Sequence, residues 1–294
     1  MRIAVLSDIH ANLPALEVVI ADMAQFKPDH VVVAGDSINW GPFSTQVIER
    51  IMREHWAVIR GNHETYLLEL YRDTVPDYRR GWTLPRYHRR TIPKKWQYVI
   101  GSLPDTLALY YPDLPPIRVV HASLGDHFTG IYPTMGADEI QVMLQGVEET
   151  TVIAGHTHLP MDVQAGPHHF INPGSVGLPL NGVDGASYAV LDGNADGWQA
   201  TFRHMTYDKA PLFAEFERIE YVKHHGATGF LAMNEFRYSR PLIWGYHQWR
   251  MQSTPTVPDS LNAAEQFLHS DLRWQYLHGE YRMNLPFDSI DWKT

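Results

Sequence analysis

The 294-residue sequence contains no cysteine. This absence excludes disulfides, thiolate nucleophiles, iron–sulfur clusters and cysteine-ligated zinc, so any bound metal must use nitrogen and oxygen ligands. Seventeen histidines are available for that purpose. The sequence also lacks an apolar run of the roughly 18–20 residues that span a bilayer, because its best candidate, residues 13–24, is interrupted by Glu17 and Asp22. No signal-peptide pattern precedes the first strand-like run, so we expect a cytoplasmic protein without a membrane partner.

Basic residues are outnumbered, with 24 Lys and Arg against 33 Asp and Glu. The formal net charge of −9 excludes general nucleic-acid binding by the chain as a whole. The segment from Arg72 to Lys95 is the exception, since it holds eight basic residues against Asp73 and Asp77. We interpret this segment as an insertion that forms a cap beside the functional site. The alternative is a solvated insertion whose arginines pair with the acidic remainder.

Strand and helix patterns alternate in the first sixty residues. Apolar runs at residues 2–7, 30–34 and 56–59 predict buried strands. Asn12-Leu13-Pro14 is typical of a helix start, because Asn caps helices well and Pro is tolerated in the first turn. A second helix is predicted at residues 47–54. This alternation favours an α/β fold with a mainly parallel sheet.

The later part of the chain predicts more strands and then helices. Strand patterns occur at residues 107–111, 117–120, 151–154, 161–164, 168–171, 188–191 and 199–203. Their short links indicate antiparallel pairing in a second sheet. From Asp208 onward, apolar residues recur at helical spacing. We therefore predict a domain over residues 1–207 and a mainly helical, aromatic C-terminal extension over residues 208–294, packed on it.

Five polar clusters follow predicted strands: Asp8-Ile9-His10, Gly35-Asp36, Gly61-Asn62-His63-Glu64, His121 and Gly155-His156-Thr157-His158. The carboxyl ends of strands in an open α/β sheet face one crevice, so we expect these clusters to converge. Carboxylates, an amide and imidazoles are suitable ligands for divalent metals. On an extended backbone Asp8 and His10 would share one face, as would His156 and His158. Each cluster alone is also typical of helix caps or buried histidines, but the ordered set is not.

This ordered set resembles the calcineurin-like metallophosphoesterase superfamily, whose pattern is D-x-H, G-D, G-N-H-[DE], H and G-H-x-H. The resemblance covers about residues 1 to 205. Within the superfamily, Asp8-Ile9-His10-Ala11-Asn12, Trp40-Gly41-Pro42 and Asn172-Pro173-Gly174-Ser175 look most like the small bacterial phosphodiesterases of the YfcE type. The resemblance implies a four-layer αββα sandwich with metals at the strand ends.

The resemblance also implies two divalent ions per chain, for which Mn, Fe, Zn, Ni and Mg all suit nitrogen and oxygen ligands. Asp8, His10, Asp36 and His158 would hold the first ion. Asp36 would bridge, and Asn62, His121 and His156 would complete the second site. A metal-bridging hydroxide would attack phosphorus, and His63 would be the catalytic histidine that protonates the leaving oxygen without binding metal.

Differences from protein serine/threonine phosphatases bear on the substrate. Where those enzymes read G-D-x-V-D-R-G, residues 35–41 place Asn39 at the acidic position and Trp40 at the arginine position. Without that guanidinium, a doubly charged monoester is disfavoured. The sequence therefore predicts hydrolysis of a small phosphodiester or nucleotide-type substrate, with a phosphomonoesterase or nucleotide pyrophosphatase as the alternative.

A non-catalytic binding scaffold is the third interpretation, which the intact His10, His63 and His156/His158 pair disfavour. Candidate substrate contacts are Arg86 and Arg89 of the basic segment and Tyr132 of the loop after His121. Guanidinium groups suit phosphates, and aromatic faces suit bases.

Overall fold

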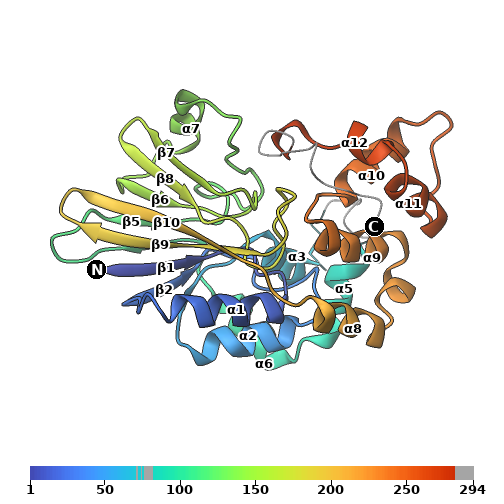
Figure 1. Cartoon of the computed structure of the whole chain (residues 1–294), viewed down its shortest axis with the longest axis horizontal. Coiled ribbons are helices and arrows are strands. Elements are labelled where there is room, and N and C mark those ends of the chain that lie inside the picture. Colours follow the sequence, from blue (N-terminus) through green and yellow to red (C-terminus); the bar gives the residue numbers. More distant parts are fainter. Residues whose placement is uncertain (71, 74, 76–81, 282–294) are drawn as a thin grey trace.

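Two five-stranded sheets stack face to face in the computed structural model of the chain, with helices on both outer faces (Figure 1). The structure describes residues 1–70, 72, 73, 75 and 82–281. From one outer face to the other, the layers are a helix, a sheet, a second sheet and a set of helices. This is the predicted four-layer αββα sandwich.

The first sheet has the strand order β10-β9-β1-β2-β3. Its strands are β1 (Arg2–Leu6), β2 (His30–Val33), β3 (Ala57–Val58), β9 (Ala186–Asn194) and β10 (Gly197–Met205). Strands β1, β2 and β3 are parallel, whereas β9 runs antiparallel to both β1 and β10. Its outer face is covered by α1 (Leu13–Met23), α2 (Ser44–Arg53) and α6 (Lys94–Ser102) (Figure 1).

The second sheet has the order β4-β5-β6-β8-β7. Its strands are β4 (Leu107–Leu109), β5 (Ile117–Val119), β6 (Thr151–Ile153), β7 (Met161–Ala165) and β8 (His168–Asn172). The inner strands β5, β6 and β8 are parallel, and only the edge strands β4 and β7 are antiparallel to their neighbours. Helix α7 (Ala137–Met143) covers the outer face of this sheet.

The predicted pairing of the later strands was wrong in two respects. Strands β5, β6 and β8 pair in parallel, and the connection from β5 to β6, which contains α7, is long enough for a parallel crossover. Strands β9 and β10 belong to the first sheet, where β9 pairs with the free edge of β1. Strand β9 is buried on both sides because Tyr188 and Val190 pack against the helices while Ala189 and Leu191 face the second sheet.

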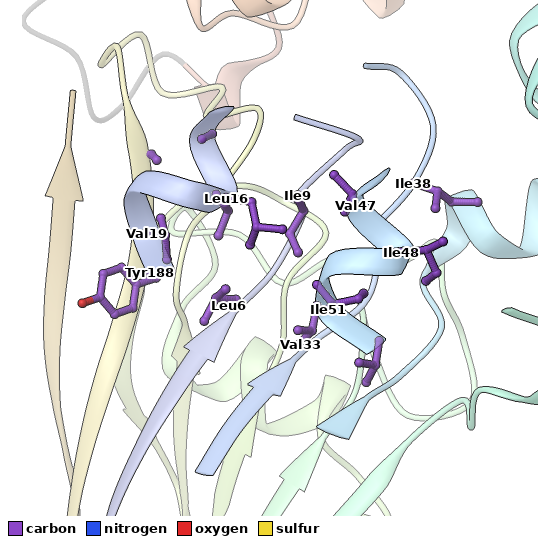
Figure 2. Packing of buried hydrophobic residues seen from close by; sticks show 14 of the residues in the cluster. Leu6, Ile9, Leu16, Val19, Val33, Ile38, Val47, Ile48, Ile51 and Tyr188 are labelled. Carbon is purple, nitrogen blue, oxygen red and sulfur yellow. The ribbon is translucent and has the colours of Figure 1, made fainter. Parts of the chain in front are cut away.

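The core of the first sheet follows from the alternation along β1. Ala4 and Leu6 pack towards the helices, and Ile3 and Val5 fill the space between the sheets. Figure 2 shows Leu6 beneath the apolar faces of α1 and α2, which include Leu16, Val19, Val47, Ile48 and Ile51. Helix α1 begins as predicted, with the Asn12 side chain accepting a hydrogen bond from the Ala15 amide at 3.2 Å.

The C-terminal region is mainly helical through residue 281, as predicted. It contains α8 (Ala210–Arg218), α9 (Tyr221–Tyr238), α10 (Ile243–Gln252), α11 (Leu261–Leu268), α12 (Leu272–Gln275) and the short 3-10 helix Gly279–Tyr281. Leu212, Phe216 and Phe236 pack against Leu178 and Leu180 of the loop after β8. The helices therefore lie at the end of the sandwich near α3 (Asn62–Glu69) and α5 (Thr83–Thr91) (Figure 1). Among the described residues, no helix has the length and apolar character that crossing a membrane requires.

Candidate metal centre

The polar clusters meet at the carboxyl ends of β1, β2, β3, β5 and β6. Three overlapping groups have ligand atoms within 4.8 Å of one another. They are Asp8, His10 and His158; His10, Asp36 and His63; and Asp36, His121 and His156. Asn62 joins the last group, since its Oδ1 lies 2.9 Å from His121 Nε2 and 3.0 Å from His156 Nδ1. The structure thus brings all the ligand residues expected from the sequence to one place.

The turns that present these ligands are not extended, and that expectation was wrong. Asp8, His10, Asp36, His156 and His158 all have left-handed backbones, with φ between 46° and 68°. Such conformations cost about 1–3 kcal/mol each for non-glycine residues and concentrate at functional sites. The loop after β1 is held against the loop after β2 by hydrogen bonds from Asp8 N to Gly35 O at 3.1 Å and from His10 N to Asp36 O at 2.9 Å. The ligands converge because both loops turn inward.

Gly61 allows the start of α3 to approach Asp36. A Cβ atom at this position would lie 2.2 Å from Asp36 Oδ1, so a side chain would displace the carboxylate. With glycine there, the His63 amide donates a hydrogen bond to Asp36 Oδ1 at 2.8 Å. The helix N-terminus also favours a negative charge at this point.

Three imidazoles are oriented by backbone carbonyls. His121 Nδ1 donates to Ala34 O at 2.8 Å, His156 Nε2 to Phe128 O at 2.9 Å, and His158 Nδ1 to Leu178 O. A carbonyl oxygen only accepts, so the bonded nitrogen carries a proton, and whenever the ring is neutral the other nitrogen presents a lone pair to the site. This tautomer fixing by a second hydrogen bond is typical of metal-ligating histidines.

The donor set fits divalent cations. In their neutral tautomers, His121 Nε2 and His156 Nδ1 direct lone pairs at the Asn62 Oδ1 acceptor. Asp8 Oδ1 is buried and has no hydrogen-bond partner in the described part of the chain, and His10 Nε2 lies 3.8 Å from it and 3.7 Å from Asp36 Oδ2. Buried acceptors that face one another are stabilised by a cation between them, and nitrogen and oxygen donors suit Zn, Mn, Fe or Ni.

The Asp36 carboxylate opposes the effect of burial on the pKa of His121. Burial alone would lower the pKa of His121, but the Asp36 carboxylate outweighs it and raises that pKa to about 9. Burial and the charge of His121 lower the pKa of His156 to about 4. The carboxylates therefore recruit a proton onto His121, and a metal ion binding there would displace it.

His63 lies beside the ligand groups at the start of α3. Its ring packs edge-on against His10 at 4.6 Å and Trp40 at 4.8 Å between centroids. Its Nε2 is 3.9 Å from Asp36 Oδ2, farther than the 3.3 Å between His121 Nε2 and the same oxygen. Burial lowers the pKa of His63 to about 4.

Trp40 is held by a residue of the C-terminal helices that sequence reasoning missed. Its indole N–H donates to Glu235 Oε2 at 2.6 Å, and the other Glu235 oxygen accepts from the Leu242 and Ile243 amides at 2.7 and 2.9 Å. Glu235 is 4% exposed, and burial raises the pKa of its carboxyl group. The extension therefore fixes the tryptophan that stands where the protein phosphatases have arginine.

Glu64 has a positioning function that sequence reasoning also missed. Its fully buried carboxylate accepts hydrogen bonds from the amides of Asp36, Ser37, Ile38 and Gly61 at 2.8–3.3 Å. Burial raises the pKa of this carboxyl group to about 7, and the Asp36 charge adds to the shift. Through these hydrogen bonds, Glu64 connects the start of α3 with the loop that contains Asp36.

Replacing Glu64 with Gln should lower the free energy of unfolding of the metal-free protein by about 2–5 kcal/mol, because the amide nitrogen cannot accept two of these buried N–H bonds. Urea unfolding measures the loss. Glu69→Gln on the same helix is the matched control, since Glu69 is 38% exposed and pairs with Arg72 at the surface. Equal losses in the two variants would contradict the positioning function.

A cavity of about 900 Å³ opens above the ligand groups and reaches the C-terminal helices. Tyr132 lines it, as does the start of α5 with Trp82, Thr83, Leu84 and Pro85. Part of the basic segment therefore lies beside the site. Arg86 and Arg89 follow on α5 and, within the described residues, are outside the cavity lining. Arg89 instead donates to Leu67 O at 3.5 Å. Residues 76–81, with Arg79 and Arg80, lie outside the described residues, and substrate contact by the arginines stays a prediction.

The fold and the histidine- and carboxylate-rich strand ends define a metallophosphoesterase. The chain belongs to the calcineurin-like phosphoesterase superfamily, whose domain model matches residues 1–196. Phosphodiesterase YfcE of Escherichia coli strain K12 is 27% identical over 202 residues, which covers 65% of this chain and 88% of the relative. The fold is similar to a metallophosphoesterase from Sphaerobacter thermophilus, with 22% identity, a TM-score of 0.66 and coverage of 81% of this chain and 100% of the other. It is also similar to the hypothetical protein PH1004 from Pyrococcus horikoshii OT3, with 20% identity, a TM-score of 0.66 and coverage of 74% and 93%.

Proposed function

We propose that this protein is a dinuclear metal-dependent phosphodiesterase. The observation that carries the proposal is the position of Asp36, which belongs to two of the three ligand groups and can therefore serve two ions. In this proposal residues 1–207 form the catalytic domain. The helices from residue 208 onward form the outer wall of its cavity.

The ligand assignment follows the two sides of Asp36. Asp8, His10 and His158 would hold one ion together with Asp36, whose Oδ2 lies 3.7 Å from His10 Nε2. On the other side, Asn62, His121 and His156 would hold the second ion. When bound, such a pair of ions neutralises the charge on the phosphoryl oxygens and supplies a water nucleophile near neutral pH. Mn, Fe, Zn, Ni and Mg are all compatible with this donor set.

His63 would act as the general acid. It stands at the rim of the ligand groups, with its Nε2 towards Asp36 and its ring held between His10 and Trp40. Burial holds the pKa of His63 at about 4 in the free protein, so the negative charge of a bound phosphodiester would raise that pKa and allow a protonated His63 to donate to the leaving oxygen. The packing restricts ring rotation, so that the proton donor keeps one direction.

The environment of Trp40 supports a diester substrate. Its indole N–H is already bonded to Glu235, so it offers no donor to the additional anionic oxygen of a monoester. The buried Glu235 side chain also lines the cavity. An extra negative charge on the substrate would therefore lack the bidentate partner that arginine provides.

The metal-loaded protein should hydrolyse bis(p-nitrophenyl) phosphate with a kcat/KM about tenfold or more above that for p-nitrophenyl phosphate. Release of p-nitrophenolate, followed with Mn, Mg and Zn, measures both rates. Trp40→Arg should reduce this ratio by raising the kcat/KM for the monoester. Trp56→Arg should leave the ratio unchanged, because Trp56 packs beside the helix-covered core and is not among the described residues that line the cavity. A monoester preference with every metal would instead support the phosphomonoesterase interpretation.

A further inference from the structure

We propose that the cavity beside His63 binds an aromatic group on the leaving-group side of the phosphodiester, packed against Tyr66 and Phe128. This inference rests on the proposed function and narrows its substrate class to aryl, arylmethyl or nucleoside-type esters. It concerns the part of the cavity that lies beyond the ligand groups.

Aromatic side chains continue outward from His63. Tyr66 lies one helical turn after His63 on α3, with 5.3 Å between ring centroids and an interplanar angle of 69°. Phe128 is 5.6 Å from Tyr66, and Trp82 is 5.1 Å from it. All three residues line the cavity. Together they form an aromatic wall, here defined as Tyr66, Trp82 and Phe128.

The position of this wall identifies the arm of the substrate that it would meet. A leaving oxygen must lie within hydrogen-bond distance of His63 to receive its proton. The group attached to that oxygen then continues past His63, and Tyr66 is the neighbour on that side of α3. Trp40 contacts a different part of the His63 ring, and its hydrogen bond to Glu235 fixes it there.

Two aromatic side chains in the cavity remain accessible. Phe128 is 38% exposed and Trp244 of α10 is 53% exposed, and both line the cavity. Exposed aromatic surface inside a concave site is typical of ligand-binding surfaces. The Phe128 carbonyl oxygen also accepts a hydrogen bond from His156 at 2.9 Å, so the aromatic wall is tied directly to a candidate metal ligand.

Two methyl phosphodiesters test the proposal: benzyl methyl phosphate and cyclohexylmethyl methyl phosphate. They have the same charge, similar size and a primary alcohol as leaving group, so they differ mainly in ring aromaticity. Release of benzyl alcohol should show a kcat/KM about threefold to tenfold higher than release of cyclohexylmethanol, through a lower KM. Tyr66→Leu should remove this difference. Tyr98→Leu is the control, because Tyr98 is 78% exposed on α6.

A second readout needs no turnover. With metal-free protein, saturation-transfer NMR of benzyl methyl phosphate should show stronger saturation of the ring protons than of the methyl protons, and Tyr66→Leu should abolish the difference. If Tyr66→Leu does not fold, Phe128→Leu replaces it, since Phe128 is on a solvent-exposed loop.

The outcomes separate this inference from the proposed function. Equal kcat/KM values for the two esters, with equal saturation of ring and methyl protons, would overturn the aromatic site while the phosphodiesterase stands. Ring-selective saturation without hydrolysis of either ester by the metal-loaded protein would support the aromatic site and overturn the phosphodiesterase. Equal effects of Tyr66→Leu and Tyr98→Leu would also overturn the aromatic site.

Discussion

Asp36→Asn should reduce the metal content from two ions per chain to one or none and lower kcat/KM by roughly 10³-fold or more. Asp36 is 1% exposed and belongs to two ligand groups, so its replacement removes a charged donor from both ions. This loss should exceed the roughly 10- to 100-fold effects that are usual for residues supporting a metal ligand. It should also exceed the effect of His121→Ala or His158→Ala, each of which affects one side of Asp36. Elemental analysis and diester turnover measure the two changes.

The matched control for that experiment is Asp22→Asn. Asp22 pairs with Arg203 at 2.8 Å on the helix-covered side of the first sheet, away from the ligand groups. This variant should keep both ions and the wild-type turnover. A wild-type content that stays at or below one ion, with no change in Asp36→Asn, would contradict the bridging assignment.

His63→Ala should lower kcat by roughly 10²- to 10⁴-fold on a diester with an alkyl leaving group while both ions stay bound, as expected for loss of a general acid. The effect should be smaller with a p-nitrophenyl ester, because p-nitrophenolate leaves without needing a proton. Steady-state kinetics on both esters, together with metal analysis of the variant, measures this. His168→Ala is the control, since His168 lies on β8 and its Nδ1 donates a hydrogen bond to the Glu149 carbonyl oxygen.

Two results would contradict this function of His63. Loss of an ion from His63→Ala would make the residue a ligand, consistent with its place in a group with His10 and Asp36. Unchanged kcat on the alkyl ester would remove His63 from the chemistry.

The sequence alone predicts that the candidate metal ligands lie close together, because each of them follows the carboxyl end of a predicted strand. Asp8 and His121 are far apart in the chain, but each follows a strand whose carboxyl end lies at the same edge of the sandwich. The left-handed turns that orient Asp8 and His158 have no comparable signal, since non-glycine residues rarely adopt positive φ. Strand periodicity also could not assign β9 to the first sheet, because the choice of a pairing edge depends on contacts that are distant in sequence.

The sequence also did not predict the function of Glu64 and Glu235, the two carboxylates that position other residues of the site. Glu64 belongs to a recognisable motif, but its function comes from four backbone amides that two separate loops bring to it. Glu235 lies in a helix without a motif, and only the folded chain shows that it holds Trp40. Residue patterns identify the chemistry of this site, whereas the groups that position its side chains depend on tertiary packing.

Titrating the metal-free protein with Mn²⁺ while following hydrolysis of bis(p-nitrophenyl) phosphate tests the two-metal phosphodiesterase most directly. The account predicts no turnover before metal is added and a rate that rises to a plateau at two equivalents per chain. Turnover that needs no metal, a plateau at one equivalent, or no hydrolysis at any metal concentration would contradict it.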